Sequence, residues 1–374
     1  MRVCLADLPA STPPYDHALA SALGRAGAEV ELLTGRPPDA QPAAGDEHYR
    51  AVEFFAGPAR GRAGRVLKLA RTPLDMLRLG RRARAADVVH YQWLGMEEVT
   101  SRMLPRKRPR VFTAHDVVPR DPRPGHAAAF RRIALGMDAV VVHSQNGADR
   151  LRSEFGVPAE RVHVIPHGAF EHLTRPPGER PLPPELAAVE QPVILFFGFL
   201  NPYKGVDVLL RAFARVTGAE LWIAGVPRMD MGELHALADA APGTVRFVSR
   251  FVADAELPAF FRRADIVVLP YREIDQSGVL NTAIAFGRPL VVSRVGGLPE
   301  LADVHDAAVA VPPGDDASLA EALSGLIADR GERERLGAAA ARVARDEHSW
   351  DAIAARHLAL YRELVDAQHG PADG

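Results

Sequence analysis

The sequence predicts an α/β protein made of two doubly wound, Rossmann-like halves. Short apolar runs alternate with helical patterns along most of the 374 residues, and this alternation is typical of parallel sheets covered by helices on both faces. A proline-rich stretch near the middle interrupts the alternation, which restarts after it. The length also suits two ordinary domains. We therefore expect two domains joined by a linker.

The first half, residues 1–173, contains the apolar runs that we expect to form the strands of the N-terminal domain. Helix candidates separate these runs, and one of them, YDHALASALGRAG at 15–27, ends in a glycine that suits a helix C-terminus. In chain order the expected strands are RVCLA (2–6), VELLT (30–34), AVEFF (51–55), DVVHYQW (87–93), RVFTAH (110–115), AVVVHS (139–144) and VHVIP (162–166).

The segment 174–191 is the best linker candidate, because prolines crowd it and a strand pattern begins directly afterwards. We expect residues 192–345 to form the second domain, with strands in PVILFFG (192–198), ELWIAG (220–225), TVRFVSRF (244–251), DIVVLP (265–270), PLVVS (289–293) and AAVAVP (307–312). The helical spacing of apolar residues from Trp350 to Leu364 predicts a closing helix over 346–367. The tail 368–374 is expected to be disordered.

Composition excludes several classes of function. The formal net charge of -2, together with the lack of any zinc-finger, aromatic RNA-binding or basic-helix pattern, argues against nucleic acid as a partner. The single Cys4 can form no internal disulfide and is expected to pack in a core. No run has the length of a membrane span or the shape of a signal peptide, so we expect a cytoplasmic protein.

Basic residues gather in the segment from Arg60 to Arg84, which also carries apolar residues at helical spacing. One interpretation is an ordinary solvated helix surface. The other is attraction to an anionic membrane or to a lipid-phosphate substrate, which would make the protein peripheral on the inner face of a membrane. The sequence leaves both open.

A candidate phosphate site lies in FFGFLNPYKGVDVLL, residues 196–210. The pattern predicts a buried strand, a turn at Gly198 that lets a ligand approach the backbone, and a helix whose N-terminal amides attract an anion. Lys204 adds a full positive charge. A glycine and a lysine occur in many α/β turns, so this segment alone is a weak signal.

A second segment strengthens this signal. In YREIDQSGVLNTAIAFGRPLVVSRVGGLPE, residues 271–300, Gly278 begins another helix after a strand and Asp275 precedes it. Gly296 and Gly297 follow the next strand. Carboxyl ends of parallel strands meet at one edge of a sheet. Glycine turns, a lysine and carboxylates at that edge suit a ligand with both phosphate and hydroxyl groups, and a nucleotide sugar fits.

These motifs resemble those of the retaining glycosyltransferases of family four, which have the two-domain GT-B fold, and the resemblance covers nearly the whole chain. Gly198, Lys204 and Gly205 match the Gly-Arg-(four residues)-Lys-Gly turn of that family. Residues 283–289 match its Ala-Met-Ala-x-Gly-x-Pro segment, and residues 296–300 match Gly-Gly-x-x-Glu. The resemblance implies two Rossmann-like domains facing a central cleft, with the acceptor held mainly by the first, the nucleotide sugar mainly by the second, and the last helix crossing back to the first.

The chain departs from the family pattern at several positions. Phe199 replaces the usual arginine, and the two usual glutamates align with Asp275 and Thr282. The loop after the first strand reads DLPASTPPYD where the family has a glycine-rich loop. We expect Arg272 or Arg294 to take over from the missing arginine.

The resemblance also implies roles in binding the donor. Lys204 would contact the diphosphate and Gly278 would donate a backbone amide to it, while Asp275 would accept hydrogen bonds from sugar hydroxyls. Each residue also has an alternative without a ligand. Lys204 could face solvent and Gly278 could simply begin a helix. Asp275 could be an N-cap, and Thr282 could pack within its helix. The expected donor-binding residues are Gly198, Lys204, Gly205, Asp275, Gln276, Ser277, Gly278 and Thr282.

Candidates on the acceptor side come from the first half. His115 and Asp116 follow a strand end, and by resemblance they lie near the transferred sugar; a histidine can donate to sugar or phosphate oxygens without being charged. Trp93 could stack on a sugar ring, and His90 and Tyr15 could border the acceptor. For His115 the alternative is a structural histidine, and for the others it is core packing. The expected catalytic residues are His115, Lys204 and Asp275.

The sequence has no Asp-x-Asp or His-Glu-x-x-His motif, so no metal or other cofactor is expected. By resemblance, the reaction moves a hexose-type sugar from a nucleotide diphosphate sugar to a sugar, lipid-linked or small-molecule acceptor hydroxyl with retention of configuration. Cell-surface polysaccharide or glycolipid synthesis would be the context. Two rivals are a sugar-nucleotide epimerase or hydrolase of the same fold, and an inactive protein that only binds nucleotide sugars.

Overall fold

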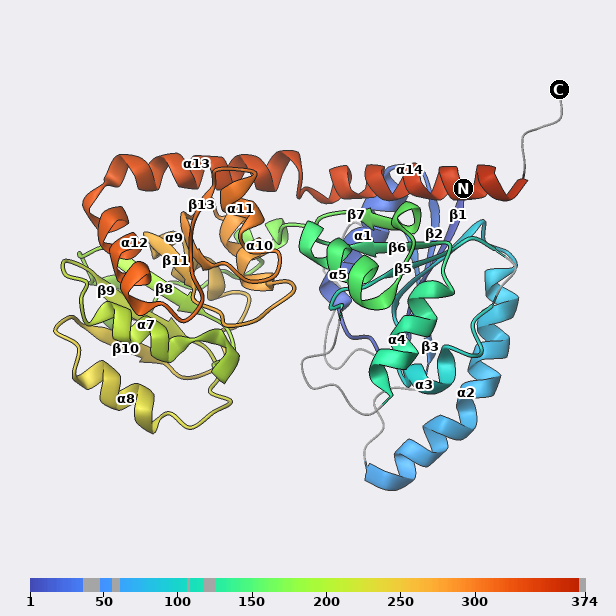
Figure 1. Cartoon of the computed structure of the whole chain (residues 1–374), viewed down its shortest axis with the longest axis horizontal. Helices are drawn as coiled ribbons and strands as arrows, with labels where there is room; N and C mark the ends of the chain where they lie inside the picture. The colour runs from blue at the N-terminus through green and yellow to red at the C-terminus, as the bar shows by residue number, and fades with distance from the viewer. Residues whose placement is uncertain (36–47, 56–60, 106–107, 118–124, 370–374) are drawn as a thin grey trace. The chain divides into compact units, whose positions relative to one another are not determined.

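The computed structural model describes residues 1–35, 48–55, 61–105, 108–117 and 125–369 (Figure 1). The chain divides into two compact units. Unit 1 consists of Met1–Pro166 together with Trp350–Gly374, and unit 2 consists of His167–Ser349. The proline-rich stretch 174–191 belongs to unit 2, where the amide of Arg180 donates to the carbonyl of Ala255 at 2.7 Å.

Unit 1 is built on a seven-stranded sheet in the order β3-β2-β1-β4-β5-β6-β7, and every pair of neighbouring strands is parallel. Each expected strand is present, and its buried positions form the cores on the two faces of the sheet. The elements are β1 (Arg2–Asp7), α1 (Pro13–Arg25), β2 (Glu29–Gly35), β3 (Arg50–Phe55), α2 (Gly61–Ala83), β4 (Val88–Trp93), α3 (Glu97–Thr100), β5 (Arg110–Thr113), α4 (His126–Leu135), β6 (Ala139–Val142), α5 (Gln145–Phe155), η1 (Ala159–Arg161), β7 (Val162–Val164) and α14 (Trp350–His369).

Local sequence signals explain where the helices of unit 1 begin and end. Helix α5 begins after Ser144, whose hydroxyl accepts from the amide of Gly147 at 3.1 Å. The same helix ends at Gly156, which has a φ of 68° and therefore needs no Cβ. Sequence alone is thus enough to place this helix.

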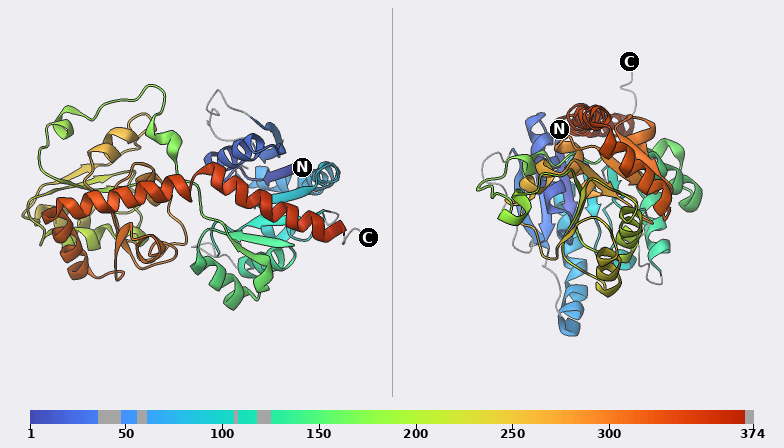
Figure 2. Two further views of the ribbon diagram at one scale, coloured as in Figure 1. Left: turned by 90° about the horizontal axis from the view of Figure 1, so that it is seen from above. Right: turned by 90° about the vertical axis from the view of Figure 1, so that its left-hand side faces the viewer.

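The closing helix α14 packs on α1 in unit 1 (Figure 2). Trp350 is only 8% exposed, and its ring centre lies 5.1 Å from that of Tyr15 in an edge-on arrangement. Ile353 and Tyr361 are fully buried in the same core. The apolar spacing of this helix therefore marks the face that it buries.

Unit 2 is built on a six-stranded parallel sheet in the order β10-β9-β8-β11-β12-β13. One hydrophobic core covers both of its faces. The elements are η2 (Glu171–Thr174), α6 (Pro184–Ala187), β8 (Val193–Phe197), η3 (Pro202–Lys204), α7 (Val206–Phe213), β9 (Glu220–Ala224), α8 (Gly232–Asp239), β10 (Val245–Val248), α9 (Leu257–Arg263), β11 (Ile266–Leu269), α10 (Gly278–Ala285), β12 (Leu290–Ser293), α11 (Glu300–Asp303), β13 (Ala308–Val311), α12 (Asp316–Ala328) and α13 (Arg330–Asp346).

The strand orders give each sheet a topological switch point. In unit 2 the chain winds outward from β8 in one direction and from β11 in the other, so the loops after these two strands diverge. Ligands of doubly wound sheets bind at that point, beyond the carboxyl ends of the strands. The expected fold class, two Rossmann-like α/β domains, is confirmed. Within the described residues, no helix has the length and apolar character needed to cross a membrane.

Candidate active site

The turn after β8 in unit 2 holds Lys204 against Gly198. A Cβ placed on Gly198 would lie 3.0 Å from Nζ of Lys204, so a side chain at residue 198 would displace the ammonium. Gly198 also has a φ of 104°, a conformation that favours glycine. Glycine is thus needed at position 198 for two reasons: the positive φ of the backbone and the space that Lys204 occupies.

Lys204 is itself buried, with 7% of its surface exposed. Its Nζ lies 5.3 Å from the ring centre of Tyr271 and 5.9 Å from that of Phe196, within the range of cation–π attraction. The next residue, Gly205, starts α7 with a φ of 66°, and a Cβ there would come within 2.0 Å of the carbonyl oxygen of Pro270. Close packing of the loops after β8 and β11 therefore fixes the ammonium at the switch point.

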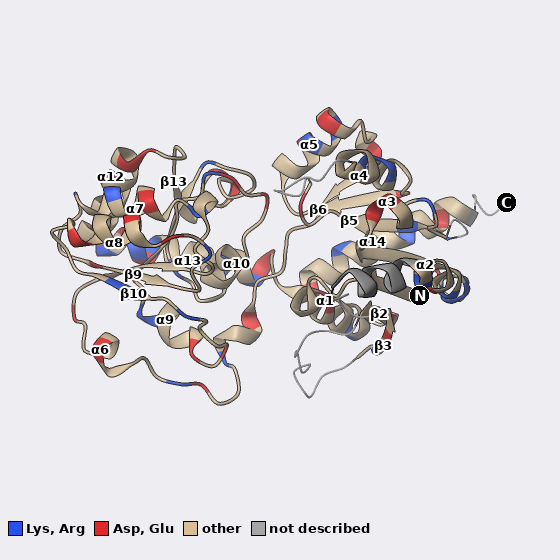
Figure 3. Ribbon diagram, turned by 90° about the horizontal axis from the view of Figure 1, so that it is seen from below, with Lys and Arg blue, Asp and Glu red and all other residues tan. Residues whose placement is uncertain are grey.

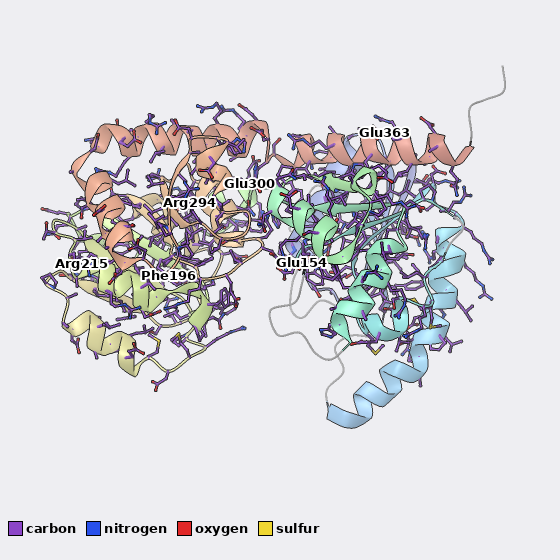
Figure 4. All side chains as sticks on the ribbon, viewed as in Figure 1. Glu154, Phe196, Arg215, Arg294, Glu300 and Glu363 are labelled. Carbon is purple, nitrogen blue, oxygen red and sulfur yellow. The ribbon has the colours of Figure 1, made fainter. Side chains whose placement is uncertain are left out.

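Neither arginine expected to replace the missing one is available to an anion. The guanidinium of Arg272 makes two hydrogen bonds to Asp207, at 2.8 and 2.6 Å, and Arg211 binds the same carboxylate. Burial works to raise the pKa of Asp207, but the hydrogen bonds from Arg272 and Arg211 lower it to about 2. Arg294, labelled in Figure 4, is held by two bonds to Asp303 at 3.1 and 2.8 Å. Our expectation for both arginines is therefore corrected.

The loop after β11 brings the remaining donor-side candidates to the same edge of the sheet. Asp275 and Gln276 are half-buried, and Ser277 caps α10 by accepting from the amide of Leu280 at 3.3 Å. Gly278 is the first residue of that helix. The N-terminal turn of α10 therefore lies at the switch point, across from Gly198 and Lys204.

The loop after β12 supports this arrangement through Gly296. A Cβ on Gly296 would come within 1.8 Å of the carbonyl oxygen of Ile274, and its φ is 54°. The amide of Gly297 donates to the carbonyl of Asp275 at 3.3 Å. The double glycine seen in the sequence is thus the point at which a neighbouring loop fixes the backbone around Asp275.

Thr282 is directed into its own helix. Its hydroxyl donates to the carbonyl of Gly278 at 2.9 Å, and the residue is 5% exposed. This bond to the preceding turn is an ordinary one for a helical threonine. It favours the packing alternative for Thr282 over a contact with the donor.

His115 in unit 1 lies in a chain of hydrogen-bonded side chains beyond β5. Nδ1 of His143 lies 2.9 Å from the carbonyl oxygen of Ile165, so it carries a proton and donates. In a neutral ring, Nε2 of His143 is then an acceptor, and it lies 3.2 Å from Nδ1 of His115. Nε2 of His115 lies 3.0 Å from Oε1 of Gln92. The imidazole of His115 is therefore held on both sides.

Aromatic rings enclose the same histidine. Trp93 stacks parallel to His115 with ring centres 5.4 Å apart, and its Nε1 donates to Thr12 at 3.1 Å. Tyr15 meets His115 edge-on at 4.7 Å and is only 1% exposed. Asp116 is half-buried in the bend that follows. The burial of Tyr15 corrects the expectation that it borders an acceptor; it packs beneath His115.

The structure likewise corrects the role expected for His90. This side chain is fully buried, and its ring nitrogens lie 2.6 Å from the hydroxyl of Tyr361 and 2.7 Å from that of Thr113. Burial, with smaller contributions from His357 and His143, holds the pKa of His90 well below its usual range. A neutral, fully bonded core histidine has no surface to offer to an acceptor.

A buried pair of carboxyl groups lies at the end of β1, in the place of the expected glycine-rich loop. Asp7 accepts from the amides of Ser11 and Thr12 at 2.7 and 3.2 Å, which stabilises its charge. Asp16 is 1% exposed, and burial followed by the nearby charge of Asp7 raises its pKa well above the usual range. Burial raises the pKa of Asp7 as well, while its hydrogen bonds work against that shift, so the pair favours a shared proton.

A search of the described residues finds no group of three His, Cys, Asp or Glu side chains placed to hold a metal ion. Cys4 is buried, as expected. Burial raises the pKa of its thiol to about 12, with Glu31 adding to the shift. Its role is packing.

Comparison with known proteins decides the family. The model of the family Glycosyltransferase Family 4 matches residues 15–169, and the model of Glycosyl transferases group 1 matches residues 191–329. A D-inositol 3-phosphate glycosyltransferase from Xylanimonas cellulosilytica is 31% identical, over 94% of this chain and 91% of its own length. The chain belongs to the family four glycosyltransferases. It is an enzyme of the hexosyltransferase type.

Further similarities of this glycosyltransferase agree with that family. The MMP alpha-(1->4)-mannosyltransferase of Mycolicibacterium hassiacum is 27% identical, over 64% of this chain and 58% of its own length. Sucrose-phosphate synthase from Thermosynechococcus elongatus has the same fold, with a TM-score of 0.75 and 20% identity, covering 98% of this chain and 100% of that protein. Anabaena HepE, solved in complex with UDP-glucose, also has this fold. Its TM-score is 0.71 at 18% identity, and the match covers 97% of this chain and 100% of that protein.

The sequence did not single out several polar residues that the structure places beside the candidate residues. Gln92 and His143 both lie at strand ends on the same edge as His115, so their place in the sheet could have revealed them. The Asp7 and Asp16 pair gave no motif to recognise.

Proposed function

We propose that this glycosyltransferase transfers a hexose-type sugar from a nucleotide diphosphate sugar to an acceptor hydroxyl with retention of anomeric configuration. The observation that carries the proposal is the convergence at the switch point of unit 2. There the buried Lys204 is fixed at Gly198, and the N-terminal turn of α10 begins at Gly278. An ammonium and the amides of a helix N-terminus are groups that bind a diphosphate.

The chemistry follows from where charge develops. When the bond from the sugar to the diphosphate breaks, negative charge grows on the leaving phosphate. Lys204 and the amides at Gly278 stabilise that charge, and a departing oxygen accepts the proton of the acceptor hydroxyl on the same face of the sugar. Positioned groups of this kind lower the barrier because they need no reorganisation during the reaction. In this proposal Asp275 accepts from sugar hydroxyls, His115 donates to a sugar or phosphate oxygen from a protonated Nε2, and no metal ion takes part.

Relatives support a donor of this class. Anabaena HepE was solved with UDP-glucose, and relatives of this chain are named as glycosyltransferases and mannosyltransferases. For this chain the proposal extends to a sugar, lipid-linked or small-molecule acceptor in the synthesis of a cell-surface polysaccharide, glycolipid or related glycoconjugate.

The experiment uses sugars of uridine, guanosine and adenosine diphosphate with the full chain. A donor should raise the melting temperature by mass action, and proton NMR of the transferred product should show the anomeric configuration of the donor. Inversion would contradict retention. Release of free sugar or an epimer without acceptor would favour a hydrolase or epimerase, and binding without any transfer would favour an inactive protein.

A membrane surface is part of the proposal because of α2. Arg60 lies outside the described residues, as do the side chains from 61 to 69. Further along this helix Leu74 and Leu77 are 58% and 64% exposed. Basic residues of the described part of α2 accompany them (Figure 3). An exposed apolar and basic helical face suits the surface of an anionic bilayer.

Vesicle sedimentation tests the membrane part of the proposal separately. The protein should sediment with vesicles containing phosphatidylglycerol at low salt and stay in the supernatant with neutral phosphatidylcholine vesicles. Leu77→Asp should weaken the sedimentation. A wild-type protein that ignores anionic vesicles at low salt would remove the membrane from the proposal and leave the transfer reaction in place.

A further inference from the structure

An arginine stacks on the aromatic ring that stands where the family has its arginine. The guanidinium carbon of Arg228 lies 3.7 Å from the ring centre of Phe199. Both side chains reach the surface, since Arg228 is exposed and Phe199 is 40% exposed. A guanidinium directly over an aromatic face is a favourable cation–π arrangement.

The backbone fixes the two residues beside each other. Beyond β8 and β9 the two segments continue side by side, with the amide of Leu200 donating to Val226 and the amide of Arg228 donating to Leu200, both at 3.0 Å. A Cβ on Gly225 would come within 2.0 Å of the carbonyl oxygen of Gly198. This close approach holds the turn of Arg228 against the turn of Phe199.

The stack is built on the residue that directly follows Gly198, the glycine at which Lys204 is held. Nζ of Lys204 lies at Gly198, and Phe199, the platform of Arg228, is the next residue. Within the part of the chain that the structure describes, Arg228 makes no ion pair, whereas Arg272 and Arg294 are both neutralised by aspartates. Arg228 is therefore a guanidinium at this edge whose charge is not already offset by a carboxylate.

We propose that Arg228, seated on Phe199, binds the diphosphate of the donor together with Lys204. This inference rests on the proposed function, because it assigns a residue to the diphosphate of that donor. A planar guanidinium presents paired N–H groups that match phosphate oxygens. Stacking on Phe199 restricts the side chain before the ligand arrives, so less conformational freedom is lost on binding. Phe199 thus positions an arginine that enters from the neighbouring strand.

The test compares binding of uridine, guanosine and adenosine diphosphates, and of inorganic pyrophosphate, by isothermal titration calorimetry. Whichever nucleoside diphosphate binds the wild-type chain should bind Arg228→Ala about tenfold more weakly, as expected for the loss of a charge-assisted hydrogen bond. The corresponding nucleoside should lose no affinity. Arg215→Ala is the matched control, because Arg215 is an arginine of unit 2 that pairs with Asp316 at 3.5 Å (Figure 4).

Moving the arginine gives a second, independent measurement. In the double variant Phe199→Arg with Arg228→Ala, the affinity for the diphosphate should return to within about threefold of the wild type, because the guanidinium returns to the same turn. Phe199→Leu alone keeps Arg228 but removes its platform, and affinity should fall about threefold. If Arg228→Ala does not fold, as judged by circular dichroism, Phe199→Leu carries the test.

The outcomes separate the inference from the function beneath it. An affinity of Arg228→Ala equal to that of Arg215→Ala would overturn the role of Arg228 while leaving the donor site in place. A loss that is equal for nucleoside and nucleoside diphosphate would overturn it too, since the diphosphate would not be the contact. If the wild-type chain bound none of the diphosphates, pyrophosphate or nucleotide sugars, the proposed function itself would fail.

Discussion

Nε2 of His143 lies 3.2 Å from Nδ1 of His115, and the proton on the far nitrogen of His143 is held by the carbonyl of Ile165. With a neutral ring at His143, Nδ1 of His115 carries a proton and donates to Nε2 of His143, so Nε2 of His115 is the atom that can change its protonation. In a neutral His115 the unprotonated Nε2 is an acceptor, so Gln92 would have to turn its amino group toward it. In a charged His115, Nε2 is a donor and matches the Oε1 of Gln92 that lies 3.0 Å away.

His143→Leu should therefore impair the reaction through His115 rather than through binding of the donor. We expect kcat to fall about tenfold, with little change in KM for the donor and a shift in the acidic limb of the pH profile of kcat. His143→Gln, which can still accept from Nδ1, should recover part of the rate. His163→Ala, on the neighbouring strand β7, is the control. An unchanged pH profile in His143→Leu would show that His143 only fills space.

The buried neutral histidines of unit 1 should cost it stability in mild acid, while Asp16, whose pKa is raised by burial, contributes in the opposite direction. Burial lowers the pKa of His357 to about 4 and holds that of His90 well below its usual range. In the unfolded chain these rings titrate near pH 6.5. Between about pH 6.5 and pH 4 the unfolded state binds protons that the folded state does not, so the free energy of unfolding falls as the pH falls.

Urea unfolding of the full chain, repeated from pH 7.5 down to pH 4.5, measures how the free energy of unfolding changes. The shift of His357 alone corresponds to roughly 3 kcal/mol when complete. His357→Phe should flatten the dependence, because its ring stays neutral at every pH. The same pH dependence in the wild type and in His357→Phe would contradict the burial of a neutral His357.

Gly205 should not tolerate a side chain. In Gly205→Ala the new Cβ would meet the carbonyl of Pro270 at 2.0 Å, in addition to the cost of a positive φ. Gly218 has a similar φ of 75°, but a Cβ there meets nothing within 4 Å. We expect Gly218→Ala to cost about 1 kcal/mol and Gly205→Ala about 3 kcal/mol or more in the free energy of unfolding. Equal losses in the two variants would show that the loops after β8 and β11 are not packed this closely.

The fold was predictable because its signals are local. Parallel strands buried on both faces appear as continuous apolar runs, and Ser144 or Gly156 mark the ends of helices with their own side chains or lack of one. The turn of Gly198 and Lys204 was predictable for the same reason, since strand, turn and helix adjoin in the chain. Whether a polar residue at a strand end faces the ligand or the core is set by packing between segments far apart in sequence.

His90 and Arg228 illustrate this limit. His90 lies within β4, and Tyr361, from the far end of the chain, lies over it with its hydroxyl 2.6 Å from Nδ1 of His90. Arg228 lies far from Phe199 in sequence, and only the side-by-side run of the two turns brings its guanidinium over the ring. Arg272 and Arg294 were expected to bind an anion because the aspartates that pair with them could not be located from sequence.

The most direct measurement concerns Lys204, on which the proposed diphosphate site is centred. Isothermal titration calorimetry with the nucleoside diphosphate that binds the wild-type chain should give a Kd at least about tenfold higher for Lys204→Met, which keeps the length of the buried side chain and removes its charge. Turnover with the matching sugar donor should fall with it, while the melting temperature without ligand stays close to that of the wild type. An unchanged Kd and an unchanged turnover in Lys204→Met would contradict the assignment of the donor diphosphate to this turn.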